Sequence, residues 1–328
     1  MQYVKLGATG LTISRLCIGT MTFGLQTDEA TAKSILNTAT GAGVTFLDTA
    51  DVYPLGGGLD TTGRTEEIVG RWLKGKRDRF IVATKCVGRT GPAAWNEGAS
   101  RKHILSAIEA SLRRLQTDYI DLYQLHFDDA STPLDETLEA LDTVVRSGKA
   151  RYIGVSNFLA YRLALALGRA EIRNLTRFVS IQPRYSLLFR EIERELIPLA
   201  REENLAVISY NPLAGGLLTG KHTFSTGPTP GTRFTLGSAA ERYQERYWHE
   251  HQFATIEALR SVVDGLSLTT ASVAWVLANP AITSVLIGAS RPEQLVDTLA
   301  AVDFKLQDEL KQKFDELTVE YRRGDAAR

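Results

Sequence analysis

The stretch FLDTADVY, residues 46–53, decides the fold that we predict for this chain. It is a short apolar run that turns abruptly polar at an aspartate, with a tyrosine five residues further on. A buried parallel strand has this form where it leaves the core. The stretches FIVATK (80–85) and IDLYQLH (120–126) end in the same way, in a lysine and a histidine. Because parallel strands end at one edge of a sheet, four side chains should meet there: Asp48, Tyr53, Lys85 and His126.

The same alternation of a short apolar run and a helical pattern continues along the whole chain. Eight such strand–helix units predict a (β/α)8 barrel. A doubly wound sheet usually has fewer strands, and its nucleotide-binding form needs a GxGxxG turn after the first strand. This chain has GTMTFG (19–24) there instead. The runs that we expect as barrel strands are 16–19, 46–48, 80–84, 120–125, 152–155, 178–181, 206–210 and 284–287.

Smaller features complete the predicted architecture. Two short runs on either side of Gly7 predict an N-terminal β-hairpin, and Ser100 is expected to cap a helix. Long Gly/Pro/Thr-rich loops follow the second strand (54–64) and the seventh strand (224–237). We expect the second loop to cover substrate or cofactor, since barrel loops on that face carry function. A C-terminal amphipathic helix is predicted from Leu310, Phe314, Leu317 and Tyr321.

Composition narrows the class of protein. The chain has 328 residues, a length that α/β barrels often reach, so we expect one domain over 1–328. Its formal net charge is zero, so no broad basic surface for nucleic acid is implied. No signal peptide, membrane span or disulfide framework is evident, and we expect a cytoplasmic protein without a membrane partner. His249 and His251 lie in a polar run that favours an exposed helix over a metal site.

The four residues at the predicted mouth have the chemistry of carbonyl reduction. A tyrosine, with an ordinary pKa of about 10, releases its proton more easily when a cation stabilises the phenolate. Tyr53 is therefore the candidate proton donor and Lys85 the cation. Asp48 would hold the lysine, and His126 would donate to the substrate oxygen. Singly these residues also fit a buried ion pair, a loop aromatic and a strand-end histidine, but together they favour one catalytic site.

The sequence resembles the aldo-keto reductase family from Val4 to about Val302. In that family an Asp, a Tyr, a Lys and a His form a catalytic tetrad, which the resemblance places at the four residues named above. Several stretches carry this resemblance; no single one is specific to the family, but together they are. The matching stretches are FLDTADVY (46–53), TEEIVGRWL (65–73), VATK (82–85), DLYQLH (121–126), GVSNF (154–158), IQPRYSLL (181–188), SYNPLAGGLLTGK (209–221) and LIGASRPEQL (286–295).

The resemblance implies a nicotinamide cofactor that is bound without a Rossmann fold, across the carboxyl mouth of the barrel. Tyr210 would stack on the nicotinamide ring. Ser156, Asn157 and Gln182 would hold its carboxamide. Arg291 at a helix start suits a phosphate, so we expect NADPH rather than NADH. The other residues implied along the cofactor are Thr20, Met21, Gln26, Asn211, Pro212, Leu213, Gly215, Gly216, Lys221, Gly288, Ser290 and Gln294.

Two departures from the family pattern bear on specificity. Thr298, at a cofactor position, stands where many members have an asparagine that contacts adenine. The triple glycine at 56–58 lengthens the loop after Tyr53, which borders the substrate. Substrate identity therefore does not carry over from the family.

Three functions remain to be weighed. We predict an NADPH-dependent reductase that acts on a small aldehyde or ketone. The second is a regulatory partner like the β subunits of voltage-gated potassium channels, which share the barrel and cofactor but, as a group, lack a histidine at the position of His126. The third is a barrel isomerase or lyase, which would bind no nicotinamide. The natural substrate and the oligomeric state, a homo-oligomer included, stay open.

Overall fold

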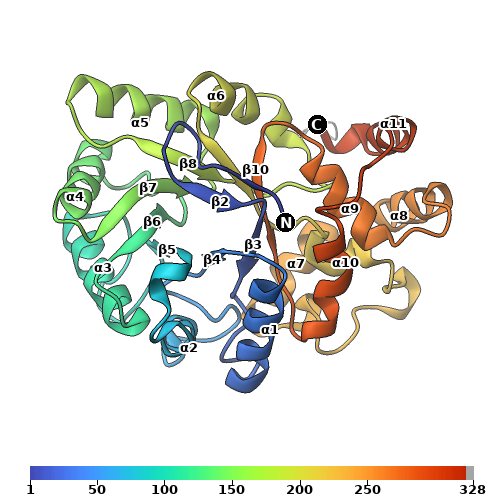
Figure 1. The fold of residues 1–328 in the computed structure, drawn as a ribbon, viewed down its shortest axis with the longest axis horizontal. Coiled ribbons are helices and arrows are strands. Elements are labelled where there is room, and N and C mark those ends of the chain that lie inside the picture. Colours follow the sequence, from blue (N-terminus) through green and yellow to red (C-terminus); the bar gives the residue numbers. More distant parts are fainter. Residues whose placement is uncertain (323–328) are drawn as a thin grey trace.

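The computed structural model describes residues 1–322, and its centre is a closed barrel of eight parallel strands (Figure 1). Each strand pairs with its neighbours along the chain, and the last pairs with the first, which closes the ring. This confirms the predicted (β/α)8 barrel. The strands are β3 (Leu16–Gly19), β4 (Phe46–Asp48), β5 (Ile81–Cys86), β6 (Ile120–Leu125), β7 (Ala150–Ser156), β8 (Phe178–Gln182), β9 (Ala206–Ser209) and β10 (Ile282–Ile287).

Helices surround the barrel and bury their apolar faces against the outer side of the strands (Figure 1). The predicted cap of α3 is confirmed, because the Ser100 side chain accepts a hydrogen bond of 3.3 Å from the amide of His103. The helices are α1 (Glu29–Gly41), α2 (Arg64–Leu73), α3 (Arg101–Leu115), α4 (Leu134–Arg146), α5 (Ala160–Ile172), α6 (Leu196–Glu202), α7 (Ala240–Tyr247), α8 (Glu250–Val262), α9 (Leu268–Leu277), α10 (Leu295–Ala300) and α11 (Asp308–Leu317).

The predicted N-terminal hairpin is present and lies across one end of the barrel (Figure 1). It pairs β1 (Tyr3–Lys5) with β2 (Thr12–Ser14) in antiparallel fashion. Leu6 and Ile13 are fully buried among inward-facing strand residues such as Phe46 and Leu122. Gly7 has φ +56°, and a Cβ there would lie 2.7 Å from the carbonyl oxygen of Asn204, so glycine is required. The amino-terminal end of the barrel is thus filled, which leaves the carboxyl end for chemistry.

The interval after β9 is more helical than the sequence predicted. The expected loop 224–237 contains short 3₁₀ turns, and α7, α8 and α9 follow it before β10. The sequence did not predict α9 because nearly all of its residues are buried, so its apolar residues show no helical period. Among residues 1–322, no helix is both long and apolar enough to cross a lipid bilayer.

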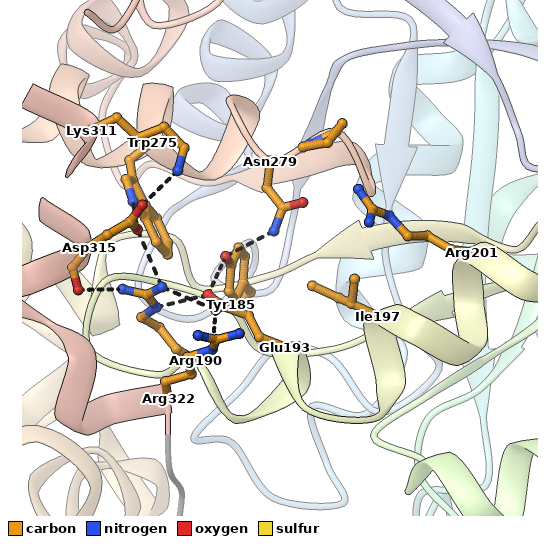
Figure 2. A pocket seen from close by; sticks show the side chains of 11 residues that line it. Tyr185, Arg190, Glu193, Ile197, Arg201, Trp275, Asn279, Lys311, Asp315 and Arg322 are labelled. Carbon is orange, nitrogen blue, oxygen red and sulfur yellow. Dashed lines mark hydrogen bonds and ion pairs between the residues drawn. The ribbon is translucent and has the colours of Figure 1, made fainter. Parts of the chain in front are cut away.

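The predicted C-terminal helix corresponds to α11, but it ends at Leu317, and Tyr321 lies beyond it in a 3₁₀ turn, Val319–Arg322. A cluster around Arg190 ties α11 to the barrel wall (Figure 2). The buried guanidinium donates to both carboxylate oxygens of Glu193, at 2.8 and 3.1 Å. It also donates to the carbonyl oxygen of Asp315, at 3.1 Å, and to the Thr318 hydroxyl, at 2.9 Å. The Asp315 carboxylate in turn accepts from the indole N–H of Trp275 at 2.9 Å. We call these five residues the Arg190 cluster.

Candidate active site

The structure brings the four predicted catalytic residues together at the carboxyl ends of β4, β5 and β6. The Lys85 ammonium pairs with the Asp48 carboxylate and lies 5.2 Å from the centre of the Tyr53 ring. The rings of Tyr53 and His126 meet edge to face, with centroids 5.7 Å apart. Tyr53 therefore stands between a cation and an imidazole, as the proton-donor chemistry requires.

The Asp48–Lys85 pair is almost fully removed from solvent, with each residue only 1% exposed. Further hydrogen bonds compensate the burial: Asp48 accepts from the side-chain amide of Gln182 at 2.8 Å and of Gln124 at 3.3 Å. Lys85 also donates to the carbonyl oxygen of Thr49 at 2.9 Å. Burial by itself disfavours the ammonium, but the charge of Asp48 outweighs it and raises the pKa of Lys85. The lysine is therefore a permanent cation.

The Tyr53 phenol is held in its protonated form. Burial raises its pKa to about 12, while the positive charge of Lys85 opposes that rise. The same ammonium that stabilises the phenolate is thus already in place beside the ring. Tyr53 carries its proton at neutral pH and has a counter-charge ready when the proton leaves.

His126 directly follows β6 and is half-buried. Its Nδ1 atom is buried and has no hydrogen-bond partner within residues 1–322. Burial, together with the charges of Lys85 and Arg242, lowers the pKa of His126 to about 3. The imidazole is consequently neutral at physiological pH and offers one N–H donor.

Residues predicted to hold the nicotinamide form a hydrogen-bonded chain beside the tetrad. The Tyr210 hydroxyl donates to the side-chain oxygen of Asn157 at 2.8 Å, and the Asn157 amide donates to the carbonyl oxygen of His126 at 2.9 Å. The Ser156 hydroxyl donates to the carbonyl oxygen of Gln182 at 2.8 Å. The structure therefore places these four residues, from the ends of β7, β8 and β9, near His126.

The segment after Tyr210 has an open, glycine-lined backbone. Gly215 and Gly216 both have positive φ, and a Cβ at Gly216 would meet no atom within 4 Å. Asn211 fixes the turn by accepting from the amide of Gly215 at 2.6 Å. Such a backbone can approach a phosphate closely. The other predicted residues of this segment are Pro212, which is buried, and Leu213, which is half-buried.

Two predicted cofactor residues, Lys221 and Arg291, are cations that influence each other through their charges. Burial and the charge of Arg291 both lower the pKa of Lys221, so two like charges lie close to one another. Neither makes an ion pair with a carboxylate within residues 1–322. A phosphate between them would relieve the repulsion, and these donors therefore fit a phosphorylated cofactor.

The remaining predicted cofactor residues fall into two groups. Ser290 and Gln294 bond to each other beside Gly288, since the Ser290 amide donates to the Gln294 side chain at 2.9 Å. Thr298 is 2% exposed and its hydroxyl donates within α10, so it is not brought to the surface with them. The second group contacts the 224–237 loop or Asp48. The side-chain amide of Gln26 donates to the carbonyl oxygen of Gly231 at 2.7 Å, and the Arg233 guanidinium donates to the Met21 sulfur at 3.9 Å. The Thr20 hydroxyl donates to the carbonyl oxygen of Asp48 at 2.9 Å.

A model of the Aldo/keto reductase family matches residues 15–319. The chain belongs to this family. Family membership supports a carbonyl-reducing oxidoreductase that uses a nicotinamide cofactor.

Curated relatives of this aldo/keto reductase match it over nearly their full length. A Bacillus subtilis (strain 168) protein named as an uncharacterized oxidoreductase, YrpG, is 41% identical, and the match covers 97% of this chain and 96% of YrpG. An Arabidopsis thaliana protein named as a probable voltage-gated potassium channel subunit beta is 37% identical over 92% of each chain. The B. subtilis aldo-keto reductase YhdN is 34% identical over 90% of this chain and 87% of its own.

Sequence reasoning missed two contributors to the site of this aldo/keto reductase. Gln124 bonds Asp48, and strand alternation was the available signal, since Leu122 and Gln124 point into the barrel on the same face as His126. Arg242, on α7, affects His126 through its charge, and no sequence signal pointed to it because α7 is distant along the chain.

Within residues 1–322, no group of three or more His, Cys, Asp or Glu residues is arranged to hold a metal ion.

Proposed function

We propose that this protein is an NADPH-dependent reductase of aldehydes or ketones, with Tyr53 as the proton donor. The observation that carries the proposal is the position of the Tyr53 ring, 5.2 Å from the Lys85 ammonium and 5.7 Å from the His126 ring. We also infer that residues 1–328 act as one domain, because β3 and β10, near the two ends of the chain, pair to close the barrel.

In this proposal Tyr53 gives its proton to the carbonyl oxygen as that oxygen gains negative charge. The phenolate that remains is stabilised by Lys85, which Asp48 holds in place. Without the ammonium, the buried phenolate would have no nearby positive charge, and the pKa of Tyr53 would rise further. The ion pair therefore acts on the reaction through the acidity of Tyr53.

His126 serves as a neutral hydrogen-bond donor in this scheme. A low pKa keeps the imidazole uncharged across the physiological range, so it polarises the carbonyl without competing as an acid. Its edge-to-face contact with Tyr53 places both donors at one side of the site. A single carbonyl oxygen is thus the acceptor that both groups would share.

The cofactor, when bound, supplies the hydride that reduces the carbonyl carbon. Asn157 and Tyr210 would hold and orient the nicotinamide, and the backbone at Gly216 would lie against the pyrophosphate. Lys221 and Arg291, two adjacent cations without carboxylate partners among residues 1–322, favour a cofactor with an additional phosphate. This supports NADPH over NADH.

The test is a fluorescence titration with NADPH and with NADH, followed by a panel of aldehydes and ketones monitored at the absorbance of the reduced nicotinamide. Tight NADPH binding with turnover is the expected result. Failure to bind either nucleotide would overturn the proposal.

A second candidate is a cofactor-binding regulatory subunit. It is favoured by the 37% identity to the Arabidopsis protein named as a probable potassium channel subunit beta. That function predicts tight NADPH binding without turnover of any carbonyl in the panel. Turnover at rates typical of enzymes, a kcat of about 1 s⁻¹ or more, would decide for the reductase.

A further inference from the structure

Helix α7 packs at the carboxyl mouth of the barrel, directly beside the segment that follows Tyr210. Its buried side chains Tyr243 and Tyr247 make the contact. The Tyr247 hydroxyl accepts from the side-chain amide of Asn211 at 2.8 Å. The Tyr243 ring lies so close to Gly215 that a Cβ there would come within 2.8 Å of it. The helix is therefore fixed in position at the mouth.

Two arginines, Arg242 and Arg246, lie four residues apart on α7 and so share one face of the helix. Both are exposed. Neither forms an ion pair with a carboxylate within residues 1–322, although Glu241 and Glu245 lie on the same helix. Each is next in sequence to a tyrosine that docks α7 on the mouth. The helix thus holds, at the rim of the site, two cations that have no carboxylate partner in the described part of the chain.

The charges of these arginines reach the groups that we assign to catalysis and cofactor binding. Arg242 contributes, after burial and Lys85, to the low pKa of His126. Burial raises the pKa of Tyr210, and the charges of Arg184 and Arg246 oppose that rise. The contacts of α7 agree with this: Asn211, which donates to Tyr247, directly follows Tyr210, and the Tyr210 hydroxyl donates to Asn157 beside His126. The helix therefore adjoins the reacting end of the site.

We propose that Arg242 and Arg246 select carbonyl substrates that carry a carboxylate, which the arginines bind while the carbonyl oxygen lies at Tyr53 and His126. This inference rests on the proposed reductase function. Guanidinium groups pair with carboxylates through two parallel hydrogen bonds, which gives orientation as well as attraction. Unpaired cations beside a reaction site also raise the local concentration of anionic substrates.

The cofactor phosphates have other partners available. Lys221 and Arg291 are the cations that flank the glycine-lined segment and the start of the helix after β10. Arg242 is instead electrostatically coupled to His126, on the opposite side of the barrel mouth from β10 in the strand order. Its position is therefore better suited to the substrate than to the cofactor.

The experiment compares two closely related substrates, 4-formylbenzoate and its methyl ester, which lacks the negative charge and is larger by one methyl group, with NADPH saturating. The readout is the ratio of kcat/KM for the acid to kcat/KM for the ester. The wild-type enzyme should prefer the acid, and R242Q and R246Q should each lower the ratio about tenfold, the loss expected for one charge-assisted hydrogen bond of about 1.5 kcal/mol. The acid preference should also weaken as ionic strength rises.

Arg113→Gln is the matched control, because Arg113 is an exposed arginine on α3 without an ion pair in the described chain. It should leave the ratio unchanged. A wild-type ratio near one, with both substrates reduced, would overturn this inference but not the reductase function. Absence of turnover for both substrates across the whole carbonyl panel would instead overturn the reductase function. Weakened NADPH binding in R242Q, measured by fluorescence, with an unchanged ratio would assign the arginine to the cofactor and also overturn the inference.

Discussion

Two buried groups of polar side chains in this molecule differ in whether every member has a hydrogen-bond partner. In the Arg190 cluster, on the outer wall of the barrel, the guanidinium donates to Glu193, to the Thr318 hydroxyl and to the carbonyl oxygen of Asp315. The carboxylates of Glu193 and Asp315 each have several partners (Figure 2). At the mouth, the Asp48–Lys85 pair is equally well bonded. Beside it, however, the buried Nδ1 of His126 has no partner within residues 1–322.

The difference distinguishes polar groups that are buried for stability from polar groups that are buried for function. A surface cavity of about 350 Å³ adjoins the Arg190 cluster, yet the carboxylates that line it are already paired with neighbouring cations. Such a network stabilises one arrangement of the C-terminal helix. A buried polar atom without a hydrogen-bond partner, in contrast, lowers the stability of the fold unless a substrate or cofactor supplies the missing partner. Removing a residue should therefore affect stability at the cluster and activity at the mouth.

The largest expected effect is that of Tyr53→Phe on catalysis. It should lower kcat for carbonyl reduction by about 10²- to 10⁴-fold, the usual contribution of a positioned general acid. NADPH affinity and the free energy of unfolding should change little, because the ring remains. Tyr161→Phe, at an exposed tyrosine on α5, is the control. A Tyr53→Phe enzyme with wild-type kcat would remove Tyr53 from the mechanism and erase the contrast between the two groups.

Arg190→Met should show the reverse pattern. It leaves the carboxylates of Glu193 and Asp315 without their buried partner, which should lower the free energy of unfolding by about 3–5 kcal/mol. Because the cluster lies outside the barrel, kcat should stay within about twofold of the wild-type value below the unfolding transition. Chemical denaturation and steady-state kinetics measure both. Arg113→Met is the control, and a large drop in kcat without loss of stability would contradict the assignment.

The pH dependence of stability tests the environment of His126. Its pKa of about 3 in the folded protein lies below the unfolded value of 6.5, so the unfolded chain takes up the proton first. The stabilisation is complete above pH 6.5 and is lost as the pH falls toward 3. Between pH 7 and 5 the wild-type free energy of unfolding should fall by up to about 2 kcal/mol more than that of His126→Gln. Parallel curves for the two proteins would show that the imidazole is not desolvated.

The smallest effect should come from Trp275→Phe. This change keeps an aromatic ring against Tyr185 but removes the indole N–H that donates to Asp315 at 2.9 Å. The free energy of unfolding should fall by about 1 kcal/mol, the net value of one hydrogen bond, with no change in kcat. Thermal and chemical denaturation measure it. A loss as large as that of Arg190→Met would mean that the cluster depends on Trp275 packing rather than on charge pairing.

Much of the candidate site could be predicted from local sequence because each tetrad residue lies near or just beyond the carboxyl end of a strand. An apolar run that stops at Asp48, Lys85 or His126 fixes both the strand and the place where its side chain emerges. Gln124 was missed, although it lies two residues after Leu122 on the same strand and its side chain therefore points to the same side. Arg242 could not be found, because its relation to His126 depends on how a helix more than a hundred residues later folds back over the mouth.

The sequence by itself determined the eight strand–helix units, the hairpin, the Ser100 cap and the positions of Asp48, Tyr53, Lys85 and His126. These depend on periodicity and on neighbours along the chain, which are local properties. Only the tertiary structure decided that α7 brings Arg242 and Arg246 to the mouth and that the Arg190 cluster anchors α11. Contacts between distant segments have no local signature, since they arise only when closure of the barrel brings those segments together.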